Sequence, residues 1–87
     1  MFSLTNPMHP GQFLKEAYME PLELTITALA KKLNMSTSAV SRLINGKSDL
    51  SYEMAILLSQ NIGRSPESWM KIQTAYGLAK AKTSLFV

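Results

Sequence analysis

The stretch Thr25–Lys47, TITALAKKLNMSTSAVSRLINGK, predicts two short helices joined by a sharp turn. Its first half places apolar residues at the i, i+3, i+4 and i+7 spacing of a helix with one buried face: Ile26, Leu29, Ala30 and Leu33. Thr25 is a good N-cap for this helix. Asn34 follows at the turn, and asparagine is one of the few residues other than glycine that tolerate a left-handed backbone. Two short helices joined in this way are the signature of a helix-turn-helix.

The second helix of this stretch is predicted to separate its polar residues from its apolar ones. Ser36 caps its start, it runs from Thr37 to about Asn45, and Gly46 closes it as the C′ residue. Its inner face carries Ala39, Val40, Leu43 and Ile44, whereas its outer face carries Thr37, Ser38, Ser41, Arg42 and Asn45. An outer face without bulky apolar side chains fits a DNA major groove about 12 Å wide and presents hydrogen-bonding groups to base edges.

This outer face predicts a DNA-binding surface with two kinds of contact. The residues predicted to read bases are Thr37, Ser38, Ser41 and Arg42, because the start of such a helix approaches the bases and arginine can bind guanine through two hydrogen bonds. The residues predicted to contact phosphates, which position the protein without reading sequence, are Thr25, Thr27, Ser36, Asn45, Gly46 and Lys47. Each residue alone could be an ordinary solvent-facing polar group, but the turn, the caps and the polar face agree.

The distribution of charge supports the same interpretation. The 87 residues carry a formal net charge of +3, and residues 30–50 hold four of the nine cationic side chains against a single acid, Asp49. A local excess of positive charge favours a polyanionic partner such as double-stranded DNA. Charge alone would fit a solvated surface equally well.

Outside this stretch the sequence predicts three more helices and no strand, so the expected fold is an all-α, compact five-helix bundle. The first helix is expected from Pro10 to about Glu20, the fourth from the N-cap Ser51 to near Asn61, and the fifth after the N-cap Ser65. The fifth is expected to fray from Gly77, which weakens a helix by about 1 kcal/mol relative to alanine. Residues 10–80 are then the folded domain, 1–9 a flexible arm and 81–87 a C-terminal tail.

The composition argues against an enzyme or a membrane protein. There is no cysteine, and the only histidine, His9, falls in the predicted arm, so no catalytic residues, metal site or cofactor site are predicted. The apolar runs are far shorter than the roughly 20 residues needed to cross a bilayer. The N-terminus lacks the basic and apolar regions of a secretory signal, so a cytoplasmic protein is expected.

The helix-turn-helix and its flanks resemble a known family. Residues 24–36 and 40–47 resemble the XRE/Cro-like repressor helix-turn-helix, of the lambda/434-repressor type. The opening His9-Pro10-Gly11 with Phe13-Leu14-Lys15-Glu16 and Glu20-Pro21-Leu22, and the closing Ser65-Pro66-Glu67 with Trp69 and Ala75-Tyr76-Gly77-Leu78-Ala79, resemble HigA-type antitoxins. The resemblance covers about residues 8–80.

This resemblance implies a bacterial toxin–antitoxin module. Such an antitoxin binds a small basic toxin that cleaves mRNA on the ribosome, and as a homodimer represses its own operon at a palindromic operator. In the wider family the base-facing positions correspond to Thr37, Ser38 and Arg42. The chain departs from the family at Asn34 and Glu23, where glycine is usual, at Ser68, where an aromatic residue is usual, and at Ile26, where relatives often have a phosphate-binding glutamine.

Two other functions remain open from the sequence. One is a stand-alone transcriptional regulator of the phage-repressor type, without a toxin partner. The other is a protein-interaction scaffold that does not use its helix-turn-helix for DNA.

Trp69 and Tyr76 lie seven residues apart on one face of the fifth helix. Core packing is one role for this pair. A dimer interface is the other, since tryptophan and tyrosine are enriched at such surfaces. A dimer would place two reading helices on half-sites about 34–36 Å apart.

Overall fold

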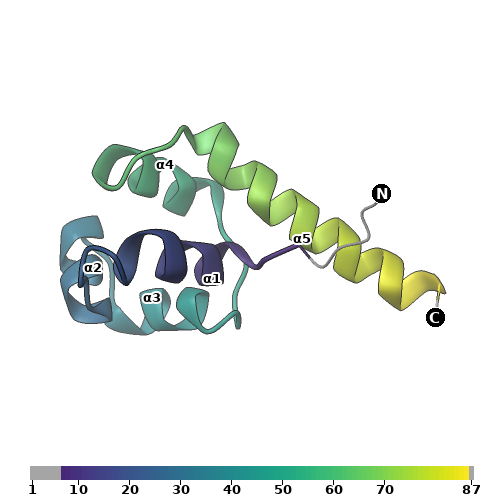
Figure 1. The fold of residues 1–87 in the computed structure, drawn as a ribbon, viewed down its shortest axis with the longest axis horizontal. Helices are drawn as coiled ribbons and strands as arrows, with labels where there is room; N and C mark the ends of the chain where they lie inside the picture. The colour runs from purple at the N-terminus through teal and green to yellow at the C-terminus, as the bar shows by residue number, and fades with distance from the viewer. Residues whose placement is uncertain (1–6, 87) are drawn as a thin grey trace.

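The computed structural model describes residues 7–86, which form helices and no strand within that range (Figure 1). The elements are α1 (Pro10–Leu14), η1 (Lys15–Met19), α2 (Ile26–Leu33), α3 (Thr37–Ile44), α4 (Tyr52–Asn61) and α5 (Pro66–Phe86). Because η1 continues α1 directly, these elements amount to five helical rods. The predicted all-α fold is confirmed.

The starts of α2, α3, α4 and α5 follow from four hydroxyl side chains. Each accepts a hydrogen bond from a backbone N–H three residues later, at 3.0–3.1 Å: Thr25 from Ala28, Ser36 from Ala39, Ser51 from Met54 and Ser65 from Ser68. An N-cap of this kind is worth about 1 kcal/mol because it satisfies an otherwise unpaired donor. The caps are local features, and all four were predicted from the sequence.

The first helix differs from the regular α-helix that the sequence predicted, because it becomes a π-helix after Leu14. The Glu20 N–H bonds to the Lys15 carbonyl, five residues back, at 2.9 Å. In a π-helix residues five apart come to lie over one another. The buried pair is therefore Leu14 and Met19, while Ala17 between them is exposed.

The core gathers side chains from all of these helices, and Trp69 is the largest one that is fully buried. Its indole is completely buried, and its Nε1 donates a hydrogen bond of 2.8 Å to the Gly63 carbonyl. The rings of Phe13 and Tyr18, again five residues apart, each lie 5.7 Å from the Trp69 ring. The π-helical turn therefore brings two aromatic residues of the first helix onto the tryptophan of α5.

α1 and α3 touch through their backbones. Gly11 lies so close to α3 that any Cβ at this position would overlap the carbonyl oxygen of Leu43. The neighbouring contacts on α3 are likewise main-chain atoms, the Leu43 carbonyl carbon and the Ile44 Cα. A glycine is therefore required where the two helices cross.

α5 is longer than the sequence predicted. It continues through Gly77 without fraying and includes residues 81–86, which were expected to form a tail. The segment after the glycine, Leu78-Ala79-Lys80-Ala81-Lys82, consists of strong helix formers that offset its cost. Figure 1 shows this end of α5 projecting beyond the other helices, and residues 80–85 are all exposed. No helix within residues 7–86 combines the length and apolarity needed to span a membrane.

Candidate nucleic-acid interface

The turn between α2 and α3 fixes the angle at which α3 is presented. Asn34 adopts the left-handed conformation, with φ 57° and ψ 45°, as the sequence predicted. The N–H groups of Asn34 and Met35 bond to the carbonyls of Lys31 and Ala30, which closes α2. Met35 packs against the core beneath the turn. The two helices are thus joined by a short connection that two backbone hydrogen bonds tie to the end of α2.

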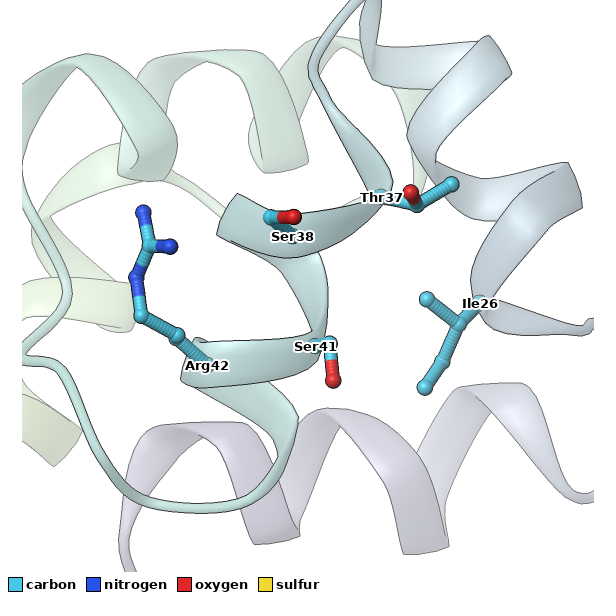
Figure 2. A pocket seen from close by; sticks show the side chains of 5 residues that line it. All are labelled: Ile26, Thr37, Ser38, Ser41 and Arg42. Carbon is cyan, nitrogen blue, oxygen red and sulfur yellow. The ribbon is translucent and has the colours of Figure 1, made fainter.

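The outer face of α3 forms a shallow depression together with the first residue of α2. Its lining residues are Ile26, Thr37, Ser38, Ser41 and Arg42. All four residues predicted to read bases are therefore brought together on one surface. Figure 2 shows Arg42 on one side of the depression, Ile26 and Thr37 on the other, and the two serines between them.

Ser41 is held in place by a neighbour one turn later. The Asn45 side-chain amide donates to the Ser41 hydroxyl oxygen at 3.2 Å. This contact uses a lone pair of Ser41 and leaves its O–H hydrogen available to an outside acceptor. Ser41 therefore remains able to donate a hydrogen bond at the depression that it lines.

The capping hydroxyls of Thr25 and Ser36 have the same property. Each already accepts a hydrogen bond from the backbone of its own helix. A hydroxyl has one donor and two acceptor sites, so its hydrogen remains free for a phosphate oxygen. Both residues are exposed, as is Thr27 in the first turn of α2. These three predicted phosphate contacts therefore lie at helix N-termini, where the dipole favours anions.

The turn after α3 corrects one prediction. Gly46 has the left-handed φ of 73° expected of a C′ residue. However, its N–H bonds to the Leu43 carbonyl at 3.0 Å, and the N–H of Lys47 bonds to the Arg42 carbonyl at 2.8 Å. These bonds cap the carbonyl end of α3. Gly46 thus has no free N–H for a phosphate, and its role is to shape the turn, whereas the Lys47 side chain is exposed.

Two side chains from distant parts of the chain hold the loop that follows Lys47. His9 Nε2 donates to the Ser48 carbonyl at 3.1 Å, and the Leu50 N–H donates to the Gln73 side-chain oxygen at 2.7 Å. α1 and α5 therefore fix the position of this loop, although neither contributes to the depression.

His9 was predicted to lie in a flexible arm and is instead 7% exposed. Its Nδ1 accepts the Gly11 N–H at 2.9 Å, so it is the N-cap of α1. The sequence contained a signal that could have found this role. Proline at the first position of a helix marks the residue before it as the cap, and Pro10 occupies that position.

Trp69 and Tyr76 differ in their availability to a partner. Trp69 has no exposed surface, so it can make no direct contact across a dimer interface and is a core residue. Tyr76 is half-buried and lines a surface hollow with Pro7, Ala79, Lys80 and Thr83. Within residues 7–86, no three acidic or histidine side chains come close enough to hold a metal ion.

Comparison with known proteins places this geometry in context. Residues 15–69 match the family model described as helix-turn-helix. The chain is 41% identical over 81 residues to virulence-associated protein A of Dichelobacter nodosus, a match that covers 92% of this chain and 79% of that protein.

Two solved antitoxin structures are also similar. The antitoxin GraA matches with a TM-score of 0.89 and 31% identity, over 92% of this chain and 86% of that one. The Pseudomonas aeruginosa antitoxin HigA, solved with the higBA promoter, matches with a TM-score of 0.87 and 31% identity, over 90% of this chain and 85% of that one.

Proposed function

The chain belongs to the helix-turn-helix family, and from this membership we propose that it is a sequence-specific DNA-binding antitoxin. It neutralises a cognate mRNA-cleaving toxin and, as a homodimer, represses its own operon. The proposal draws on the solved antitoxins that this chain resembles, one of them in complex with its promoter. The family is one of DNA-binding regulators and not a class of enzyme.

The observation that carries the proposal is the polar depression on α3. Thr37, Ser38 and Ser41 present short hydroxyl groups there, and Arg42 adds a long cation at one side. In the major groove these groups can hydrogen-bond to base edges, with Arg42 suited to O6 and N7 of a guanine. The surface therefore combines donors and acceptors with a shape that admits a base-pair edge.

Phosphate contacts on both sides of this depression would set the register of the protein on the duplex. On the α2 side we assign this role to Thr25, Thr27 and Ser36, whose hydroxyl hydrogens can point to phosphate oxygens. On the other side we assign it to Asn45 and Lys47, at the end of α3. These contacts supply affinity that falls with salt and does not depend on sequence.

A single α3 reads only a few base pairs, so the proposed repressor is a two-fold dimer on a palindromic operator. We place α5 at the dimer contact. Its exposed Leu78 and Leu85, with the half-buried Tyr76, provide apolar surface that this protomer leaves uncovered.

The proposed toxin contact lies on the acidic edge formed by the first helix and the turn that follows it. Glu16, Glu20 and Glu23 are all exposed there and complement a basic toxin.

A mobility-shift titration tests the DNA-binding half of the proposal. The protein is titrated against the DNA upstream of its own gene at two salt concentrations, with competitor DNA. Tight binding that survives the competitor is the expected result. Absence of binding at low salt would contradict DNA binding and favour a protein-interaction scaffold.

Co-expression tests the antitoxin half. A neighbouring reading frame for a small basic protein should inhibit growth alone and become harmless in the presence of this chain. If no adjacent frame is toxic, the chain is a stand-alone regulator of the phage-repressor type.

A further inference from the structure

Ile26 stands out in the depression because its side chain can form no hydrogen bond. It is the first residue of α2, is half-buried, and packs partly against the core. A β-branched side chain in a helix has one strongly preferred rotamer. Ile26 therefore presents a fixed hydrocarbon surface among groups otherwise suited to hydrogen bonds.

The positions of the residues that line the depression indicate which group on DNA could pack against Ile26. Figure 2 shows Ile26 beside Thr37, with Arg42 on the far side and Ser38 and Ser41 between. The surface thus runs from apolar to cationic. In the major groove, the C5 methyl of thymine is the only methyl group that an unmodified base pair offers, whereas guanine offers two acceptors that suit arginine.

We propose that Ile26 is a specificity-determining residue that contacts the C5 methyl of a thymine in each operator half-site. Arg42 reads a guanine on the opposite side of the depression, so each half-site contains both bases. Any other base opposite Ile26 leaves polar edge groups facing hydrocarbon and without partners, which is unfavourable. The inference rests on the proposed DNA-binding function.

Replacement of thymine by uracil tests the inference, because it removes one methyl group and leaves the base pair intact. Operator duplexes from the upstream DNA are made with each thymine replaced in turn. At one position in each half-site, the replacement should weaken binding by wild-type protein about fourfold, the fold-change for exposing one CH₂-sized group. In Ile26→Ala the same replacement should have no effect.

The readout is a ratio of two affinities measured on one protein variant. A loss of stability in Ile26→Ala lowers the active fraction equally for both duplexes and cancels from the ratio. Ile56→Ala is the matched control, since Ile56 is an exposed isoleucine on α4 outside the depression. This variant should keep the fourfold effect of the methyl group.

Two results would overturn the inference while leaving DNA binding in place. One is an equal uracil penalty in wild type and Ile26→Ala at every thymine, and the other is insensitivity of the wild type to all replacements. Failure of the wild type to bind any upstream sequence specifically would instead overturn the proposed function, and the inference with it.

Discussion

The imidazole of His9 meets the phenol ring of Tyr76 edge-on, with 4.8 Å between ring centroids and 78° between ring planes. The same imidazole caps α1 and bonds to the loop after α3. One side chain therefore joins the start of the first helix, the loop that follows α3 and the middle of α5. Removing it disturbs the local cap of α1 and two contacts between segments far apart in the sequence, those with Ser48 and Tyr76.

His9→Ala should lower the free energy of unfolding by about 2–4 kcal/mol. The cap contributes about 1 kcal/mol, the hydrogen bond to Ser48 a similar amount, and the edge-on aromatic contact about 0.5–1.5 kcal/mol. His9→Asn keeps a capping oxygen and should recover about 1 kcal/mol of the loss. Urea denaturation measures both values. Equal stability of the two variants would show that the cap contributes nothing.

Arg42→Ala should weaken binding to the specific operator by about 1–3 kcal/mol, because the contact to guanine is lost. The affinity for unrelated DNA should change far less, so the ratio of operator affinity to nonspecific affinity should fall. Lys71→Ala is the control, since it removes an exposed cation from the first half of α5, outside the depression and away from the leucines assigned to the dimer contact. Unchanged operator binding by Arg42→Ala would contradict the assignment of the reading face.

Lys47→Ala should weaken binding to specific and unrelated DNA by the same factor. A phosphate contact does not depend on the base sequence. Its loss should reduce the slope of log K against log salt concentration by about 1. Titrations at several salt concentrations on both duplexes measure this slope. A loss confined to the specific operator would instead place Lys47 on a base.

Glu23→Gly should raise the free energy of unfolding by about 1 kcal/mol. Glu23 has a φ of 54°, a left-handed conformation that costs a residue with a Cβ about 1–2 kcal/mol, and glycine adopts it freely. Glu20→Gly is the matched control, because it removes the same charge from a position with φ −65°. There glycine should destabilise by about 0.5–1 kcal/mol. If the two substitutions changed the free energy of unfolding in the same direction, the backbone strain at Glu23 would be contradicted.

The features that could be predicted from the sequence are those that depend on near neighbours. Thr25 and Ser36 cap helices through a backbone group three residues away, and Asn34 closes α2 through its own backbone conformation. The outer face of α3 follows from helical periodicity alone, which is why Thr37, Ser38, Ser41 and Arg42 could be predicted to share one surface.

The features that were missed depend on contacts between distant segments. The Ser48 partner of His9 lies 39 residues away, which local pattern cannot supply. The π-helical turn is accompanied by the packing of Tyr18 on Trp69, a contact made only once α5 has docked. The hydrogen bond from the Gly46 N–H to the Leu43 carbonyl likewise could not be predicted, because it depends on the geometry of the turn.

The contact of Gly11 with the backbone of α3 separates two properties of this protein. Because the atoms that Gly11 meets are main-chain atoms of Leu43 and Ile44, the seating of α3 on α1 is independent of the side chains that α3 carries outward. If those outward residues were exchanged for those of a relative, this chain would acquire the operator preference of that relative. The position of α3 against α1 would not change. Recognition can then diverge between paralogues by a few substitutions, without a new fold and without loss of cooperative folding.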